Sequence, residues 1–250
     1  MFNKFNKDRI ITGMLLIFLV VIIALIDNFF FTWLFLGIVF MFGFYEAMKL
    51  FNVKENSPYL FALVLWIFSY FYPNPDDLIF IALIVFTSVM VFKQNVNFKL
   101  ISTLIYPAGS FLFLLALYKD FGIEALIWLV IVVASTDIGA YFTGKSIGKR
   151  KFCKVSPNKT WEGVIGGVLI ASILGTIYGV ASISVPLSFC ISFFVSVASI
   201  FGDLFESYLK REAGVKDSGN ILPGHGGILD RMDGYMFAAV IMVVLLRGFA

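Results

Sequence analysis

Acidic, basic and glycine residues are concentrated between Ser207 and Asp233, and their types suit phosphate and cation chemistry. Asp230 and Asp233 are three residues apart, so a helix would place both carboxylates on one face. Carboxylates held close together repel each other unless a cation is present, and hard oxygen ligands of this kind suit Mg²⁺. The segment Pro223–Gly227 contains three glycines and His225, the only histidine. Because glycines let backbone N–H groups approach a phosphate closely, this stretch is the first candidate site.

Two further polar groups lie near the ends of neighbouring apolar runs. Ser156–Gly163 contains Lys159 just before such a run, and both lysines and helix N-termini suit polyphosphate. Asp137, with glycines soon after it, forms the second group. These positions can converge with the Ser207–Asp233 stretch only if the intervening runs are helices that end on the same side.

A polar stripe on one later run supports this arrangement. Its members follow steps of three and four residues, so a helix would align them on one face: Ser192, Ser196, Ser199, Asp203, Ser207 and Lys210. A small-residue packing face explains the serines equally well. Asp203 and Glu206 are harder to explain by packing, because charges inside a membrane helix usually face a partner or a cavity.

The elements that position these residues are predicted to be membrane helices. Hydrophobic residues make up 60% of the chain, charged residues only 14%, and the mean hydropathy is +0.94. This composition excludes an ordinary soluble domain. The apolar runs are long enough to cross about 30 Å of hydrocarbon, where the backbone must satisfy its own hydrogen bonds as a helix.

The fold class is therefore predicted to be all-α, a polytopic membrane protein of about nine transmembrane helices. The predicted spans are Ile10–Ile26, Phe29–Leu50, Pro58–Tyr72, Leu78–Phe92, Leu100–Tyr118, Ile123–Phe142, Gly163–Val180, Val185–Ser207 and Gly234–Phe249. With a cytoplasmic N-terminus, only Lys119 and Arg247 among the basic residues fall on the opposite side. That asymmetry favours this orientation, with the polar groups on the cytoplasmic face.

The chain divides by polarity into two predicted regions. Residues 1–120 form a transmembrane scaffold, in which Glu46 is almost the only ionisable residue inside a span. Residues 121–250 form the catalytic region, with cytoplasmic loops at 144–162 and 208–233.

These residues resemble a known family. The pattern Ser207-x-x-Lys210-Arg211-x₄-Lys216-Asp217-x₅-Pro223-x-His225-Gly226-Gly227-x-x-Asp230-Arg231-x-Asp233 resembles the signature of phosphatidate cytidylyltransferases, also called CDP-diglyceride synthetases. Ser156–Gly163 is similar to that family's Ser-Pro-x-Lys-Thr-x-Glu-Gly block, and Asp137–Gly144 resembles its block in the sixth span. The resemblance covers roughly Asp137–Asp233, and the N-terminal half matches only as a run of hydrophobic helices.

The resemblance implies an enzyme that transfers CMP from CTP to phosphatidic acid, giving CDP-diacylglycerol and pyrophosphate. It implies catalytic roles for Asp203, Lys210, Asp230 and Arg231, and metal ligation by Asp203, Asp230 and Asp233. The residues expected to bind substrate phosphates are Asp137, Asn158, Lys159, Ser207, Arg211, Lys216, Asp217, His225, Gly226 and Gly227. Three roles are compatible with His225: a phosphate ligand, a base, or a hydrogen-bond donor that shapes the loop. The expected cofactor is Mg²⁺, with room for a second cation such as K⁺.

The expected partners are CTP, phosphatidic acid and membrane lipid, with no nucleic acid, and the expected location is a bacterial inner membrane. A homodimer is one expectation, because the glycine pairs Gly163/Gly167 and Gly175/Gly179 offer faces for close helix packing. The same glycines could equally serve packing within one subunit. Two alternative functions are a CTP-dependent kinase of polyprenols or similar lipids and an ion-coupled transporter. A transporter would be expected to carry ionisable residues near the bilayer middle and in both halves, which this chain does not.

Overall fold

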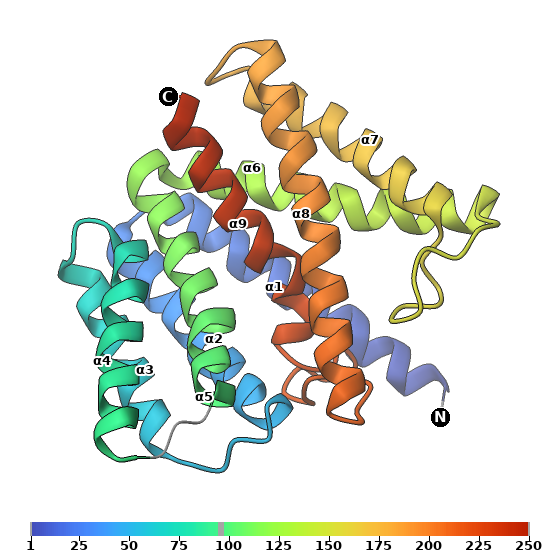
Figure 1. Ribbon diagram of the computed structural model, residues 1–250. Helices are drawn as coiled ribbons and strands as arrows, with labels where there is room; N and C mark the ends of the chain where they lie inside the picture. The colour runs from blue at the N-terminus through green and yellow to red at the C-terminus, as the bar shows by residue number, and fades with distance from the viewer. Residues whose placement is uncertain (1, 95–97, 250) are drawn as a thin grey trace. The chain divides into compact units, whose positions relative to one another are not determined.

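The chain is almost entirely helical in the computed structural model, which describes residues 2–94 and 98–249 and the side chains from Arg9 onward (Figure 1). Its α-helices are α1 (Phe2–Ile26), α2 (Phe29–Leu50), α3 (Ser57–Phe71), α4 (Leu78–Phe92), α5 (Phe98–Thr103), α6 (Ser110–Ile147), α7 (Trp161–Gly179), α8 (Val185–Glu212) and α9 (Leu229–Phe249). A 3₁₀ turn covers Pro75–Asp77, and a π-helical turn at Leu104–Gly109 includes Pro107. Over the two described ranges no β-strand forms, which confirms the all-α class.

Seven helical stretches in the described ranges are long and apolar enough to cross a membrane, so the protein is a multi-pass integral membrane protein. Ser57–Phe71 is a further apolar helix of 15 residues. One stretch, Phe98–Ile147, contains two of the predicted spans, and Gly122 interrupts it with a φ of 74°. The count of nine spans stays a prediction.

Helix boundaries agree best with the sequence where apolar residues run from end to end. The predicted limits of α2 and α4 are those observed. At the polar ends the helices are longer than expected: α8 continues to Glu212 and α9 begins at Leu229, so the connection expected at 208–233 is reduced to 213–228. The other long connection is likewise 148–160 rather than 144–162. Polar residues at these positions form further helical turns because pairs such as Glu206 and Lys210 stabilise them.

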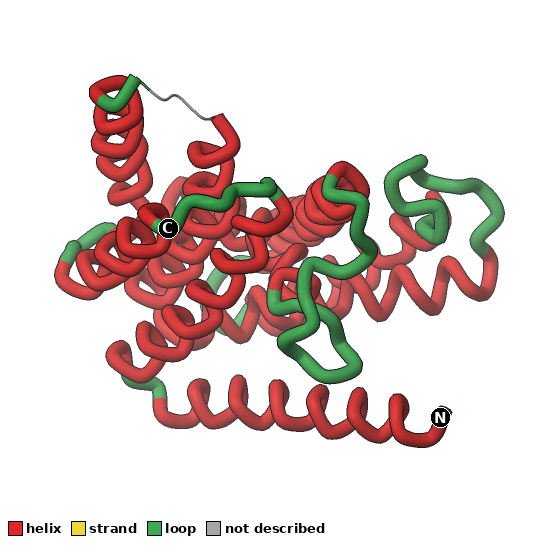
Figure 2. Tube along the Cα trace, turned by 90° about the horizontal axis from the view of Figure 1, so that it is seen from below, coloured by secondary structure: helices red, strands yellow, loops and turns green. Residues whose placement is uncertain are grey.

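The chain separates into two compact units, one formed by Met1–Lys119 with Glu212–Arg231 and the other by Asp120–Arg211 with Met232–Ala250. In the first unit α2 is central, because it contacts α1, α3, α5 and the π-helical turn. Phe40, Phe44 and Phe111 are almost fully buried at its core. Figure 2 shows α1 as a single helix along the edge of this unit, and most of its apolar side chains are exposed.

In the second unit, glycines bring α7 close to α6. A Cβ on Gly139 would lie 3.1 Å from the Cα of Gly167, and a Cβ on Gly163 would lie 3.1 Å from the Cα of Gly144. Gly175 also packs against neighbouring helices of the same chain. The glycine faces of α7 are therefore used for packing within one subunit, and a homodimer stays a prediction without their support.

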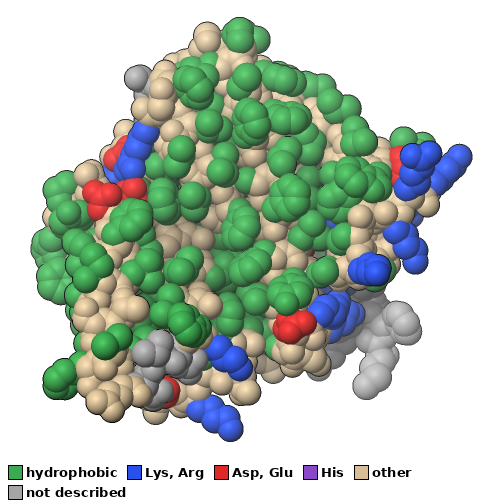
Figure 3. Space-filling model, in the orientation of Figure 1, with side chains coloured by type: hydrophobic (Ala, Val, Ile, Leu, Met, Phe, Trp, Pro, Cys, Tyr) green, Lys and Arg blue, Asp and Glu red, His purple; other side chains and the backbone are tan. Residues whose placement is uncertain are grey.

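Large apolar side chains cover much of the surface, as expected for helices in lipid. They dominate the face shown in Figure 3. Leu25 is 80% exposed and Phe92 is 89% exposed.

The two basic residues that the orientation leaves on the opposite side both have partners. Lys119 donates to the carbonyl oxygen of Tyr72 at 2.5 Å, and Arg247 forms an ion pair with Asp120 at 2.7 Å.

Candidate active site

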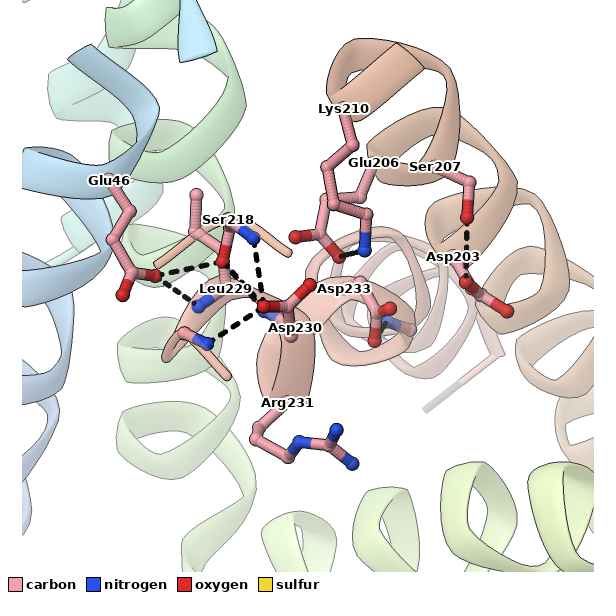
Figure 4. A network of polar contacts seen from close by, with 12 residues as sticks. Glu46, Asp203, Glu206, Ser207, Lys210, Ser218, Leu229, Asp230, Arg231 and Asp233 are labelled. Carbon is pink, nitrogen blue, oxygen red and sulfur yellow. Dashed lines mark hydrogen bonds and ion pairs between the residues drawn. The ribbon is translucent and has the colours of Figure 1, made fainter. Parts of the chain in front are cut away.

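The connection between α8 and α9 is attached to α2 by one buried acid. Glu46 is 1% exposed, and its carboxylate accepts hydrogen bonds from the backbone N–H of Ile228 at 3.1 Å and of Leu229 at 2.8 Å. The hydroxyl of Ser218 lies 3.1 Å from the same carboxylate (Figure 4). These contacts satisfy backbone donors that the start of a helix leaves without partners inside the helix. Neither Glu46 nor Ser218 was among the predicted site residues.

Asp230 is held by the same connection. Its Oδ2 accepts hydrogen bonds from the Ser218 backbone N–H at 2.9 Å, the Ser218 hydroxyl at 3.0 Å and the Gly227 N–H at 2.8 Å. Gly226 has a φ of 83°, and a Cβ there would lie 2.8 Å from this oxygen. The two predicted glycines therefore allow the backbone to surround the Asp230 carboxylate, which is a role in shaping the site.

Helix α1 contacts the connection at its tip, Pro223 and Gly224. Arg9 donates from Nε to the carbonyl oxygen of Gly224 at 2.6 Å, and the Thr12 hydroxyl donates to that of Pro223 at 3.0 Å. Gly224 adopts a φ of 73°, which favours glycine. The tip is thus fixed by residues far away in sequence, and no local pattern indicated these contacts.

His225 follows Gly224 in the connection, and the side chain of Arg231 reaches it from the first turns of α9. Arg231 donates from Nη2 and Nε to the carbonyl oxygen of His225, at 3.1 and 3.3 Å. Burial lowers the pKa of His225, and the positive charges of Arg231 and Arg9 lower it further. Histidine normally titrates near 6.5, so His225 is neutral at pH 7. A neutral imidazole surrounded by cations fits loop shaping or phosphate contact.

The second unit contains a separate cluster of charges on α8. Asp203 forms an ion pair with Lys159 and accepts a hydrogen bond from the Ser207 hydroxyl at 3.4 Å. One turn further along, the ammonium group of Lys210 lies 3.4 Å from the carboxylate of Glu206, which is fully buried (Figure 4). Four of these residues were predicted. Glu206 was noticed as an ionisable residue in the span but was not assigned to the site.

Asp233, in the first part of α9, belongs to the same unit. Its carboxyl group lies close to that of Glu206 and within electrostatic range of Asp203 and Asp137. A Cβ on Gly202 would overlap the backbone carbonyl of Asp233, so this glycine permits the close approach of α8 and α9. So many acidic groups in one place require protons or cations to balance their charge.

The connection 148–160 positions Lys159. The Lys159 carbonyl accepts from the N–H of Phe152 at 2.8 Å, and the Thr160 hydroxyl caps α7 by accepting from the N–H of Gly163 at 3.1 Å. Glu162 accepts from two backbone N–H groups at the start of the connection, at 3.1 and 3.2 Å. Lys159 therefore projects from a folded connection at the N-terminus of a helix, as its sequence context indicated.

The serine stripe of α8 has two different parts. Ser192 accepts a hydrogen bond from the indole N–H of Trp128 at 3.1 Å, and the Ser196 hydroxyl lies 2.7 Å from that of Thr136. Both serines are fully buried against α6, so this part is a packing face. At the polar end, Asp203, Ser207 and Lys210 instead have charged or polar partners, as expected for the predicted site.

The remaining predicted residues are exposed. Asn158, Arg211, Lys216, Asp217 and Asp137 all have exposed side chains. Asp217 lies near Gly226, because a Cβ built on Gly226 would lie 3.5 Å from the Cβ of Asp217. Asn158, Lys216 and Asp217 lie on the connections, Arg211 near the end of α8 and Asp137 on α6. Phosphate binding by these residues stays a prediction.

The carboxylates have the right chemistry for a hard divalent cation. In the second unit, Asp203 and Asp233 offer oxygen atoms within electrostatic range of each other, and Mg²⁺ prefers oxygen ligands together with water and phosphate. Across residues 2–94 and 98–249, no three acidic, histidine or cysteine side chains form a preformed cation site. Mg²⁺ commonly relies on one or two carboxylates and on substrate phosphates, so these residues fit it.

The fold therefore defines a polytopic membrane protein whose acidic and basic residues are of the kinds that bind phosphates and cations. The chain belongs to the cytidylyltransferase family, whose model matches residues 7–249. It is 44% identical to a phosphatidate cytidylyltransferase of Helicobacter pylori J99, covering 96% of this chain and 92% of that protein. The enzymes of the same name from Bacillus subtilis 168 and Thermotoga maritima are 36% and 33% identical, over 98% and 81% of this chain and 98% and 83% of their own lengths. Membership confirms the predicted family and a nucleotidyltransferase enzyme, rather than a lipid kinase or a transporter.

Proposed function

We propose that this protein transfers CMP from CTP to phosphatidic acid and releases CDP-diacylglycerol and pyrophosphate. The observation that carries this proposal is the similarity, over almost the whole chain, to proteins named phosphatidate cytidylyltransferase. The signature residues from Ser207 to Asp233 add support, because they supply basic groups for phosphates and carboxylates for a cation.

In the proposed reaction, a phosphate oxygen of phosphatidic acid forms a bond with the α-phosphorus of CTP. The bond from that phosphorus to the bridging oxygen breaks, and pyrophosphate leaves with the electron pair. Phosphatidic acid is already ionised, so no side-chain nucleophile and no general base is needed. The main obstacle is repulsion between two polyanions, which cationic side chains reduce by neutralising the phosphates.

Named residues divide this work. Lys159, Lys210, Arg211, Lys216 and Arg231 are proposed to bind the phosphates. Asp203, Asp230 and Asp233 are proposed to hold Mg²⁺, which when bound polarises phosphate oxygens and helps to align them. The two lysines on or near α8 already lie against carboxylates, so arriving phosphates would exchange one anionic partner for another.

The location follows from the substrates. The headgroup of phosphatidic acid lies at the membrane surface, where the polar ends of the helices are expected, and CTP is a soluble nucleotide. We propose a bacterial inner membrane with the active site on the cytoplasmic face, because the named relatives are bacterial and basic residues are concentrated on that side of the predicted topology.

The test uses purified protein in detergent with CTP, Mg²⁺ and phosphatidic acid. Pyrophosphate release should require all three, and replacing phosphatidic acid with diacylglycerol should abolish it. The variant Asp203→Asn provides a negative control that should remain folded. Pyrophosphate release that does not depend on phosphatidic acid, or none at all, would contradict the proposal.

A further inference from the structure

Glu46 is a buried acid that the signature of the site does not include. It lies near the end of α2, in a unit whose other spans are almost free of ionisable residues. Burying a carboxylate in a membrane protein is costly unless donors surround it, and such residues commonly mark functional sites. Glu46 meets the backbone N–H groups of Ile228 and Leu229 and the hydroxyl of Ser218.

These donors belong to the start of α9. A helix start normally receives a cap from a side chain next to it in sequence. Here the cap comes from α2, 182 residues before Ile228 and 183 before Leu229. The negative charge also suits the positive end of the helix. The first turn of α9 is therefore fixed to α2, and Asp230 is the next residue in that turn.

Ser218 links Glu46 to Asp230. Its hydroxyl lies 3.1 Å from Glu46 Oε2 and 3.0 Å from Asp230 Oδ2, and its backbone N–H donates to the same oxygen of Asp230. A serine hydroxyl has one proton to donate, so the two carboxylates share a single hydroxyl donor. A change at Glu46 would alter how Ser218 holds Asp230.

The backbone approaches the Glu46 carboxyl group closely at two glycines. A Cβ on Gly219 would overlap the Glu46 carboxyl group, and a Cβ on Gly227 would lie 2.5 Å from Glu46 Oε2. Ser218 itself is 5% exposed. The connection therefore closes around the Glu46 carboxylate, which is what a fixed geometry at Asp230 requires.

We propose that Glu46 is a positioning residue, which fixes Ser218 and the first turn of α9 and so orients the Asp230 carboxylate for nucleotidyl transfer. This role rests on the function proposed above and on Asp230 as a cation ligand. Glu46 does not touch substrate, and it acts through Ser218 and the backbone of α9.

The first test is Glu46→Gln, with Glu55→Gln as a matched control. Glutamine has the same shape but only one acceptor oxygen, so at least one donor loses its partner. We expect kcat to fall roughly 10- to 100-fold, the effect typical of residues that orient metal ligands, with a rise in the Mg²⁺ concentration needed for half activity. Glu55→Gln is the same chemical change at an exposed position after α2, and it should leave both kcat and the Mg²⁺ requirement unchanged.

A second readout does not depend on turnover. Electron paramagnetic resonance of Mn²⁺, titrated into protein with CTP but no lipid, measures cation binding directly. Glu46→Gln should weaken Mn²⁺ binding by about tenfold, and Glu55→Gln should not. If the wild-type protein binds Mn²⁺ but transfers no CMP, the proposed function fails while the role of Glu46 is still measured.

Ser218→Ala and the double variant test the route. If Glu46 acts through Ser218, the double variant should be little worse than the more affected single variant, because coupled residues are not additive. Two results would overturn the proposal. One is additive losses of kcat and of Mn²⁺ binding. The other is a lower melting temperature for Glu46→Gln with unchanged kcat and unchanged Mn²⁺ binding in the folded fraction, which would show a purely structural role.

Discussion

The two units hold their acidic residues in different ways. In the unit that contains α2 and the 213–228 connection, Glu46 and Asp230 accept hydrogen bonds mostly from backbone N–H groups. In the other unit, Asp203 and Glu206 lie against the ammonium groups of Lys159 and Lys210. A backbone donor cannot leave without moving the chain, whereas a lysine has a long flexible side chain that can change partners.

The two arrangements suit two different tasks of an enzyme that acts on phosphates. A network of backbone donors is suited to hold one carboxylate in a fixed geometry. A set of lysine–carboxylate pairs is suited to receive anions, because an arriving phosphate can replace a carboxylate as the partner of each lysine. Substitutions in the network of backbone donors should therefore mainly affect turnover, and substitutions of the paired lysines should mainly affect substrate binding.

The largest expected effect is that of Asp230→Asn. The amide keeps one acceptor oxygen but loses the charge, so the network should remain folded while cation binding fails. We expect kcat to fall by roughly 10²- to 10³-fold, the loss typical when one preorganised group that stabilises transition-state charge is removed. A thermal melt would confirm folding, and activity close to that of the wild type would show that the cation site lies elsewhere.

Lys159→Gln should have the next largest effect, and mainly on binding. Removing this ammonium group leaves Asp203 without its ion pair and takes one positive charge away from incoming CTP. We expect KM for CTP to rise roughly tenfold with a smaller change in kcat, as expected when an interaction binds the substrate and the transition state equally. Lys151→Gln is the control, because Lys151 is exposed on the same connection. A change confined to kcat would contradict the division between the units.

A smaller effect concerns pH and His225. Because its pKa is lowered in the folded protein, the folded state binds fewer protons than the unfolded state just below the ordinary value of about 6.5. The free energy of unfolding should therefore decrease as pH falls through 6.5, with the loss complete below the lowered pKa. His225→Gln should show a smaller drop in melting temperature between pH 7.5 and pH 5.5 than the wild type. An equal drop in both proteins would show that His225 does not contribute.

The smallest effect is expected for Lys99→Gln. Lys99 is exposed on α5 and lies outside both clusters. Activity should stay within about twofold of the wild type, as for most surface substitutions. A large loss in the same pyrophosphate assay would mean that residues of the first 120 other than those near the site also take part in activity.

Sequence predicts this molecule well where one physical constraint dominates. The limits of α2 and α4 are those expected from hydropathy, because each apolar run begins and ends at polar residues. The end of α8 was placed too early, since Tyr208–Glu212 looks like a loop by polarity alone. The i, i+4 pair of Glu206 and Lys210 was the available signal that the helix continues.

The site shows a similar pattern. Residues next to each other along the chain, such as Pro223–Gly227 and Asp230, could be recognised from their types and spacing. Glu46, Arg9 and Thr12 reach the connection across about two hundred residues, and such contacts leave no local pattern. An isolated acid in an apolar span was still a usable signal, because burying it requires a partner.

The most direct test of the account follows the phosphorus atoms of CTP. Purified protein is given phosphatidic acid, Mg²⁺ and CTP labelled with ³²P at either the α- or the γ-phosphate, and the lipid is extracted. We predict that the α-label appears in a cytidine-containing lipid and the γ-label in pyrophosphate. Transfer of the γ-label to lipid, with release of CDP, would contradict the account and indicate a kinase.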